Sequence, residues 1–270
     1  MMSKTGYLGP EGSYSQLAAQ NIRRGTPVAY PSFPALFGAL GRDEVSGIVL
    51  PVENSLNGGV MQNLDLLQNA EGVLAVGEIR VRIEHRLVTI KGAPYGGITR
   101  VYSHPQALAQ CAKFLHEKLP RAALVPTLST SACLGMINCP SDAGIIGLQN
   151  IDKKYELSPC AISDEKLNYT QFLYVVKHSP QDIPSGEKVF LSITCAHRPG
   201  ALIQALSAFA DEGINMTRIE SRPIKERMGE YRFFIEVEGD YSSPAVQSAL
   251  SRLHAACSSV KILGSYAHSE

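Results

Sequence analysis

The sequence predicts an α/β protein in two parts, and three observations lead to this class. Over the first 177 residues, short apolar runs alternate with amphipathic helical stretches, which is typical of a largely parallel sheet covered by helices on both faces. A polar, Pro- and Gly-rich segment follows at 177–188, as expected of a linker or an exposed crossover. The remaining residues have a different pattern, and a length of 270 suits one large domain or two smaller ones.

Short apolar runs in the first part are predicted strands. They lie at 5–8, 45–50, 86–90, 99–102, 122–125 and 143–146. Most are followed by a helical stretch, and a further apolar run, Leu173 to Val176, follows Thr170, which is expected to open another strand.

The second part has the order β-α-β-β-α-β. Its predicted strands are 189–196, 214–224, 231–238 and 260–266. Apolar residues recur at i, i+4 and i+7 in both predicted helices, as Leu202, Leu206 and Phe209 and then as Val246, Leu250 and Leu253. Each helix therefore has one apolar stripe to cover a four-stranded antiparallel sheet, which indicates a ferredoxin-like module.

The composition argues against several classes of protein. Lys plus Arg and Asp plus Glu each number 25, so the formal charge is zero, whereas a nucleic-acid binder normally has a basic excess. No apolar run approaches the ~20 residues that span a bilayer, and the Gly9-Pro10 turn interrupts any signal-peptide core. We expect a cytoplasmic protein with no nucleic-acid or membrane partner.

The spacing of Cys and His predicts no metal site. The six cysteines are widely separated and the seven histidines lack ligand spacing, so free thiols serving as small apolar side chains are expected. The chain also lacks a Walker loop, a Gly-x-Gly-x-x-Gly fingerprint and a Gly-x-Ser-x-Gly elbow.

Four polar turns at the starts of predicted helices are candidate binding elements. They lie at 9–16, 52–60, 103–106 and 128–133, and Ser13 with Gln16 and Ser103 with Gln106 have capping-box spacing. N-capping explains any one of them. Four such turns, all at the ends of predicted strands, indicate more than capping, because open α/β sheets bind ligands at this edge and helix N-termini favour anions. The residues alone thus predict an anion-binding α/β domain, with Glu53 either a catalytic acid or base or a solvated cap.

These residues resemble the ordered motifs of the prephenate dehydratase family. The motifs are Gly9-Pro10-Glu11-Gly12-Ser13-Tyr14-Ser15, Val52-Glu53-Asn54-Ser55, Ser103-His104-Pro105-Gln106-Ala107 and Asn168-Tyr169-Thr170-Gln171-Phe172. In the second part, Gly200-Ala201-Leu202 and Glu220-Ser221-Arg222-Pro223 resemble the family's ACT regulatory domain. The resemblance covers nearly the whole chain in the correct order.

The resemblance implies a catalytic domain of two lobes with a type II periplasmic-binding-protein-like fold and an active site in the cleft. It places this domain at 1–180, with lobes at about 1–78 with 163–180 and at 79–162, and the ACT domain at 188–268. The implied reaction of L-phenylalanine biosynthesis converts prephenate to phenylpyruvate with loss of water and carbon dioxide. Aromatisation of the ring drives this reaction, so the resemblance implies neither a redox cofactor nor a metal ion.

The resemblance also assigns roles to residues. Thr170 is the family's essential threonine, which gives a hydrogen bond or proton to the departing ring hydroxyl. The other implied catalytic residues are Asn54, Ser103, Gln110 and, as an orienting group, Glu53. The implied substrate-binding residues are Ser13, Ser55, Ser129, Thr130, Gln171 and Phe172. The implied effector site for phenylalanine, at the interface of paired ACT modules in a homodimer or homotetramer, comprises Gly200, Ala201, Leu202, Asn215, Glu220, Ser221, Arg222 and Pro223.

Gln171 departs from the family motif, which normally reads Thr-Arg-Phe. Gln keeps hydrogen-bond donors but lacks the permanent charge and the bidentate fork of Arg. If that Arg meets a substrate carboxylate, affinity or rate falls; if it only braces the cleft, Gln can serve. The alternatives left open are an arogenate dehydratase and a non-catalytic aromatic-amino-acid sensor. Thr170 and the ACT module argue against a third, a prephenate decarboxylase that does not aromatise its product.

Overall fold

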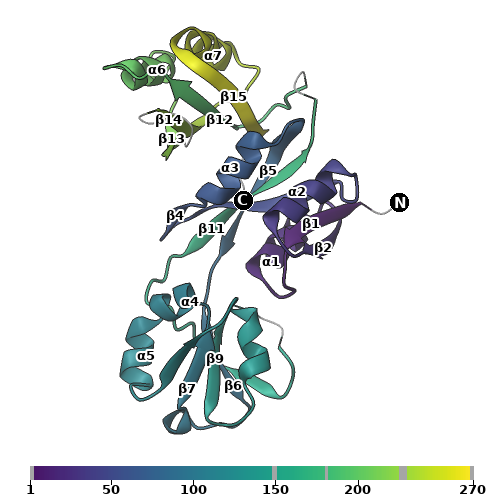
Figure 1. Cartoon of the computed structure of the whole chain (residues 1–270), viewed down its shortest axis with the longest axis vertical. Helices are drawn as coiled ribbons and strands as arrows, with labels where there is room; N and C mark the ends of the chain where they lie inside the picture. Colours follow the sequence, from purple (N-terminus) through teal and green to yellow (C-terminus); the bar gives the residue numbers. More distant parts are fainter. Residues whose placement is uncertain (1–2, 148–150, 180–181, 225–229, 268–270) are drawn as a thin grey trace.

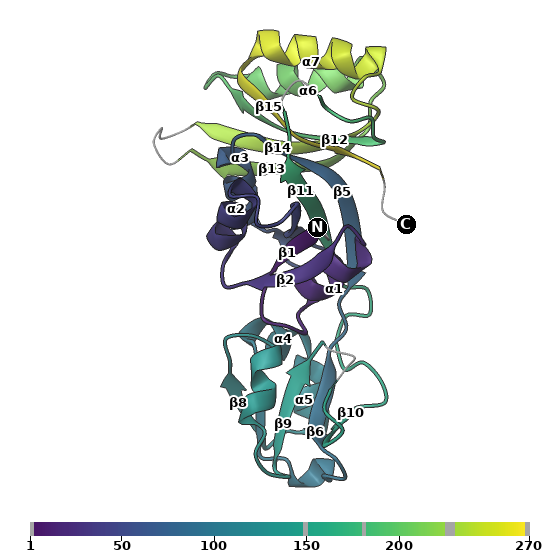
Figure 2. The same cartoon turned by 90° about the vertical axis from the view of Figure 1, so that its right-hand side faces the viewer.

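Two mixed β-sheets organise the chain, of which the structure, a computed structural model, describes residues 3–147, 151–179, 182–224 and 230–267. Three bodies are stacked along the long axis of the molecule (Figures 1 and 2). We name them the first lobe, which contains the N-terminal strands and lies in the middle, the second lobe at one end and the C-terminal domain at the other.

The first lobe contains the strands that carry the motifs at 52–55 and 168–172. Its sheet has the order β5 (Val73–Arg82), β11 (Tyr169–Lys177), β3 (Gly47–Asn54), β1 (Lys4–Leu8) and β2 (Thr26–Tyr30), with the short β4 (Gly58–Gly59) paired to β3. β1 is parallel to β2 and β3, whereas β11 is antiparallel to β3 and β5. The helices of this lobe are α1 (Tyr14–Asn21), α2 (Phe33–Gly41) and α3 (Met61–Asn69).

The second lobe is a smaller mixed sheet with short helices. Its strands have the order β10 (Tyr155–Leu157), β6 (Arg86–Ile90), β9 (Asp142–Ile146), β7 (Arg100–Ser103) and β8 (Ala123–Pro126). Its helices are α4 (Pro105–Gln110) and α5 (Ala112–Lys118), with 3₁₀ turns η1 (Tyr95–Gly97) and η2 (Ser131–Met136). Residues 83–85 and 158–168, between β5 and β6 and between β10 and β11, connect the two lobes.

The C-terminal domain has the predicted β-α-β-β-α-β order. Its elements are β12 (Lys188–Cys195), α6 (Ala201–Ala210), β13 (Met216–Pro223), β14 (Tyr231–Glu238), α7 (Pro244–Ala256) and β15 (Cys257–Tyr266). The strands pair antiparallel in the order β13-β14-β12-β15, and both helices lie on one face (Figure 2). β15 also pairs with β5 of the first lobe, at Gly264 and Ala75, so one sheet continues through both bodies.

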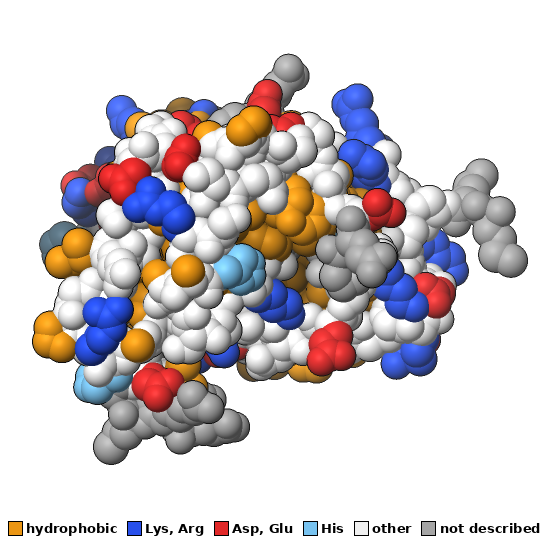
Figure 3. All heavy atoms as spheres, turned by 90° about the horizontal axis from the view of Figure 1, so that it is seen from above, with side chains coloured by type: hydrophobic (Ala, Val, Ile, Leu, Met, Phe, Trp, Pro, Cys, Tyr) orange, Lys and Arg blue, Asp and Glu red, His pale blue; other side chains and the backbone are white. Residues whose placement is uncertain are grey.

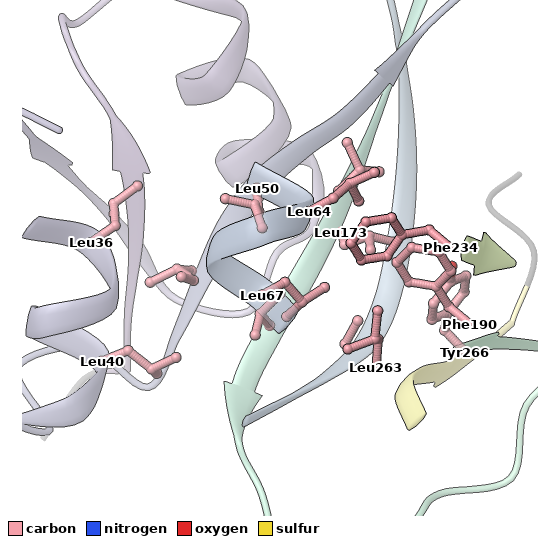
Figure 4. Close-up of a cluster of buried hydrophobic side chains, with 14 of the residues drawn as sticks. Leu36, Leu40, Leu50, Leu64, Leu67, Leu173, Phe190, Phe234, Leu263 and Tyr266 are labelled. Atoms are coloured by element: carbon pink, nitrogen blue, oxygen red, sulfur yellow. The ribbon is translucent and has the colours of Figure 1, made fainter. Parts of the chain in front are cut away.

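An apolar core joins the C-terminal domain to the first lobe (Figure 4). It contains Leu50, Leu64 and Leu173 from the first lobe and Phe190, Phe234, Leu263 and Tyr266 from the C-terminal domain. Each of these side chains is at most 1% exposed. Because burying one large apolar side chain contributes about 1.5–3 kcal/mol, this core fixes the sheet of the C-terminal domain against the strands of the first lobe.

The charged side chains of the molecule are mixed in sign, in agreement with the zero net charge. On the face seen in Figure 3, Lys and Arg side chains are interspersed with Asp and Glu around hydrophobic side chains at the centre. Among the described residues, no helix is long and apolar enough to cross a bilayer.

The structure confirms the α/β class and the predicted strands to within a few residues, and it corrects two expectations. A largely parallel sheet is wrong, because β11 returns from the second lobe and inserts antiparallel between β5 and β3, and β6 is antiparallel to β9. Strands β2, β4, β5 and β10 were not predicted; β5 mixes Glu78, Arg80 and Arg82 with apolar residues and so lacks a plain apolar run. Of the predicted linker, Pro180 and Gln181 lie outside the described residues.

Candidate active site

A cavity of about 370 Å³ lies between the two lobes, next to the segments that connect them. Residues of both lobes line it, together with Ile83, His85 and Asn168 from the connections. The predicted site residues found in this lining are Ser13, Asn54, Gln110, Ser129, Thr130 and Thr170. The cavity has the size of an ordinary small-molecule site.

Asn54 fixes the Thr170 hydroxyl at the wall of this cavity. The two residues are direct neighbours on β3 and β11, and Asn54 Nδ2 donates to Thr170 Oγ1 at 3.1 Å. The amide cannot be reversed, because Asn54 Oδ1 accepts from the backbone N–H groups of Leu56 and Asn57 at 3.1 and 3.2 Å. With Oγ1 accepting a hydrogen bond, the Thr170 proton is free to be donated to a ligand.

A chain of amides continues from Asn54 into the second lobe. Asn54 Nδ2 also donates to Asn168 Oδ1 at 2.7 Å, and Asn168 Nδ2 donates to Gln110 Oε1 at 3.3 Å. His85 Nε2 lies 2.9 Å from the same Gln110 oxygen. Because that oxygen accepts from both neighbours, Gln110 Nε2 remains available as a donor toward the cavity.

His85 is buried and neutral. Burial lowers its pKa below the ordinary value of 6.5, and the hydrogen bond with Gln110 only partly opposes this. Its Nδ1 is buried without a hydrogen-bond partner among the described residues, so the proton resides on Nε2 and is donated to Gln110. The sequence did not single out His85, and its position at the chain crossing, between β5 and β6, is the signal that could have done so.

One of the predicted helix starts, that of α1, is capped as expected, because Ser13 Oγ accepts from Gln16 N at 3.3 Å. In the hydroxyl-rich turn at 128–133, Ser129 Oγ accepts from Ala132 N at 3.1 Å, but the N-cap position of η2 is Thr130, whose side chain forms no capping hydrogen bond. At α4 the cap is His104, whose Nδ1 accepts from Gln106 N. The expected capping role of Ser103 is therefore wrong, and α3 begins after Val60 with no side-chain cap.

Comparison with known proteins decides the family. A family model described as prephenate dehydratase matches residues 5–180, and a second, described as ACT domain, matches residues 189–255. The chain belongs to the prephenate dehydratase family. This confirms the resemblance, and the C-terminal domain is an ACT domain.

Individual relatives agree with the family match. A bifunctional chorismate mutase/prephenate dehydratase of Neisseria gonorrhoeae is 36% identical over 96% of this chain and 73% of its own length. A prephenate dehydratase of Amycolatopsis methanolica is 32% identical over 100% of this chain and 90% of its own. The crystal structure of a prephenate dehydratase from Arthrobacter aurescens in complex with L-Phe has a TM-score of 0.87 and 28% identity, covering 98% of this chain and 90% of that one.

The other residues predicted for the active site do not line the cavity between the lobes. Ser103 is fully buried, and its hydroxyl donates to Ile145 O at 2.6 Å. Phe172 belongs to the core of the first lobe. Glu53, Ser55 and Gln171 line a second cavity of about 310 Å³, on the side of β3 and β11 that meets the ACT domain. The side chains of a strand alternate between its faces, so Thr170 faces the cleft and Gln171 the ACT domain.

Gln171 lies in a buried cluster of charged groups rather than in the cleft. Its Nε2 donates to Glu78 Oε2 at 2.6 Å and to Glu236 Oε2 at 3.3 Å. Lys188 Nζ lies 3.1 Å from both carboxylates. Burial acts to raise the pKa of Glu236, but hydrogen bonds from Tyr266, Thr217 and Lys188 outweigh it and hold this pKa below its ordinary value. The neutral Gln171 amide thus donates hydrogen bonds to two carboxylates, Glu78 and Glu236, which both pair with Lys188.

The predicted effector residues are divided between the two faces of the ACT domain. Ala201 and Leu202 line a cavity of about 380 Å³ at the start of α6, where Gly200 forms the cap with φ of 78°. Ser221 and Pro223 pair with Phe233 and Tyr231, which line the same cavity.

The remaining effector candidates make other contacts. Arg222 pairs with Asp65 of α3 at 2.6 Å. Glu220 lies against β4, where a β-carbon at Gly59 would come within 3.0 Å of its Oε1. Asn215 donates to Glu238 at 3.1 Å. The strand β13 therefore contacts the first lobe through Glu220 and Arg222.

No group of three His, Cys, Asp or Glu side chains that could hold a metal ion occurs within residues 3–147, 151–179, 182–224 and 230–267.

Proposed function

We propose that this protein converts prephenate to phenylpyruvate, with loss of water and carbon dioxide, in the cavity between its lobes. The observation that carries the proposal is the Asn54–Thr170 pair: a threonine hydroxyl in an interlobe cavity accepts a fixed amide hydrogen bond and keeps its own proton for a ligand. Membership of the prephenate dehydratase family supports the same substrate.

Thr170 acts as the donor to the ring hydroxyl. As the ring carboxylate leaves as carbon dioxide, its bonding electrons enter the ring, and the hydroxyl departs as water with a proton from Thr170, which solvent restores. The hydrogen bond from Asn54 Nδ2 favours the negatively charged form of Thr170 Oγ1. This arrangement makes an ordinarily weak acid a better donor at the moment of the reaction.

Neutral groups hold the substrate, which is a dianion. Gln110, Ser13, Ser129 and Thr130 line the cavity, and α1 begins at Tyr14, directly after its N-cap Ser13, so the N-terminus of this helix lies at the cavity. Hydrogen bonds from neutral groups can recognise carboxylates without a surplus of Lys and Arg. The neutral state of His85 fits this design, because its role is to orient the Gln110 amide.

Gln171 supports the bracing alternative. Its contacts with Glu78 and Glu236 hold β11 from the side opposite Thr170, so replacing Arg by Gln here leaves the cavity lining unchanged. Turnover is therefore expected despite the departure from the family motif.

Regulation and assembly belong to the same proposal. L-phenylalanine binds to the ACT domain and changes turnover, in line with the match to the ACT model and with the relative whose structure holds L-Phe. We include in the proposal a homodimer or homotetramer formed through ACT domains, a cytoplasmic location, and the division into a catalytic domain at 1–180 and an ACT domain at 188–268.

The test is an assay of the purified full chain with prephenate and, separately, with arogenate, following phenylpyruvate and phenylalanine. We expect phenylpyruvate from prephenate with the higher kcat/KM. A higher kcat/KM for arogenate would reassign the substrate. Absence of product from both, together with tight binding of L-phenylalanine, would contradict the enzyme and favour the sensor.

A further inference from the structure

Two adjacent residue pairs on β3 and β11 face opposite sides of the sheet. Asn54 pairs with Thr170, and these residues line the interlobe cavity. The next pair, Glu53 with Gln171, lines the cavity against the ACT domain. A shift of the second pair must therefore move the backbone that carries the first.

Arg218 of β13 holds Glu53 from the ACT side. Its side chain is 5% exposed, and its Nη2 lies 2.6 Å from Glu53 Oε2 and donates to Val52 O at 3.0 Å. Its Nε and Nη1 have no hydrogen-bond partner among the described residues, and its guanidinium lies 5.8 Å from the centre of the Phe190 ring. The hydrogen bonds of this buried cation thus all go to β3, immediately before Asn54.

The other face of β13, the strand that carries Arg218, lies toward the helices and the cavity of the ACT domain, where a bound ligand could displace the strand. Ile219 and Ser221 alternate with Arg218, Glu220 and Arg222, and they lie opposite Ile235 and Phe233 on the helix side of the sheet. Phe233 lines the cavity at the start of α6. Strand β13 therefore has the ACT cavity near one face and, on the other face, the contact of Arg218 with Glu53.

We propose that Arg218 is a positioning residue for the dehydration reaction. Through Glu53 it sets the position of β3, and hence the orientation of the Asn54 amide on the Thr170 hydroxyl. A ligand that displaces β13 alters kcat through this contact. The inference rests on the proposed function, because it concerns the same Thr170.

The test compares Arg218→Gln with Asp65→Asn in the full chain. Asp65→Asn removes the other ion pair between β13 and the first lobe, Arg222–Asp65 at 2.6 Å, which ends on α3 instead of β3. We expect Arg218→Gln to lower kcat about tenfold with KM for prephenate changed less than about twofold, and Asp65→Asn to keep kcat within about twofold of the natural chain. Because Arg218 acts through Glu53, the double variant Glu53→Gln/Arg218→Gln is expected to be no slower than the slower single variant.

Hydrogen–deuterium exchange supplies a readout that does not require turnover. Uptake in 52–57 and 168–173 is expected to rise in Arg218→Gln and not in Asp65→Asn, while circular dichroism of both matches the natural chain. Arg218→Lys, which keeps a buried cation, is used in the same measurements if Arg218→Gln does not fold, and is expected to show the same changes at smaller size.

The outcomes separate the two proposals. If the natural chain makes no phenylpyruvate, the proposed function fails. The exchange data then test only whether Arg218 holds β3 through Glu53. If the natural chain is active but Arg218→Gln and Asp65→Asn are equal in kcat and in exchange, Arg218 is only a structural contact and the inference is overturned.

Discussion

Thr170 and Gln171 are neighbours in the chain with opposite surroundings. The motif around them identified both as site residues, but the alternation of a β-strand sends one side chain into the cleft and the other into a charged cluster. Sequence reasoning found the cleft residues Ser13, Asn54 and Gln110, because helix starts and family motifs mark them. It could not find Lys188 or Glu236, because their burial depends on pairing across domains.

A carboxylate at position 171 is expected to destabilise the protein. Gln171→Glu would place a third carboxylate beside Glu78 and Glu236, which share Lys188. We expect a loss of about 3 kcal/mol in the free energy of unfolding at pH 8, measured by urea titration. Gln171→Met, which removes the hydrogen bonds without adding charge, should lose about 1–2 kcal/mol. Equal losses in the two variants would show that charge in this cluster is unimportant.

His85 predicts a pH dependence of stability. Because burial lowers its pKa in the folded state, only the unfolded chain gains a proton on this residue as pH first falls below 6.5. The His85 contribution to stability is therefore complete above pH 6.5 and is lost as pH falls toward the folded-state pKa, with a slope of at most about 1.4 kcal/mol per pH unit. Urea titrations at pH 7.5 and 5.5 should show a smaller acid loss for His85→Asn than for the natural chain; the same loss in both would exclude this source.

At the scale of elements, periodicity predicted the ACT domain well and the first lobe less well. Of the predicted helix stripes, Phe209, Val246, Leu250 and Leu253 are buried as expected, whereas Leu202 and Leu206 are only partly buried against the same core. Strand β5 was missed because Glu78 and Gly77 interrupt its apolar pattern. The direction of β11 could not be predicted, since it depends on how the chain returns from the second lobe and not on local residues.

Tyr14 of helix α1 packs against the segment that joins the lobes and against the second lobe. Its hydroxyl donates to Glu84 O and accepts from Glu84 N at 2.9 Å, and a β-carbon at Gly147 of the second lobe would overlap its ring. We expect Gly147→Ala to force the lobes apart, to raise KM for prephenate and to cost about 1–3 kcal/mol of stability. Steady-state kinetics and thermal unfolding measure both effects.

Gly135→Ala is the matched control, because a β-carbon at Gly135, also in the second lobe, would have nothing within 4 Å. If Gly147→Ala has the same KM and the same melting temperature as this control, the contact of Tyr14 with Gly147 does not control the spacing of the lobes.

For the whole molecule, one sheet joins the regulatory and catalytic parts. β15 pairs with β5, and an apolar core and the contact of Arg218 with Glu53 close the interface. The family motifs predicted that both parts exist. The contact between them could not be predicted, because residues 53 and 218 are far apart in the chain and each is an ordinary surface type.

The proposed mechanism requires that the Thr170 hydroxyl donates the proton that releases water. The most direct measurement is kcat for phenylpyruvate formation in Thr170→Ala and Thr170→Ser, with prephenate binding measured alongside. We predict that Thr170→Ala lowers kcat at least about 100-fold with binding and circular dichroism retained, while Thr170→Ser, which keeps the hydroxyl, loses far less. A kcat of Thr170→Ala close to that of the natural chain would contradict the claim.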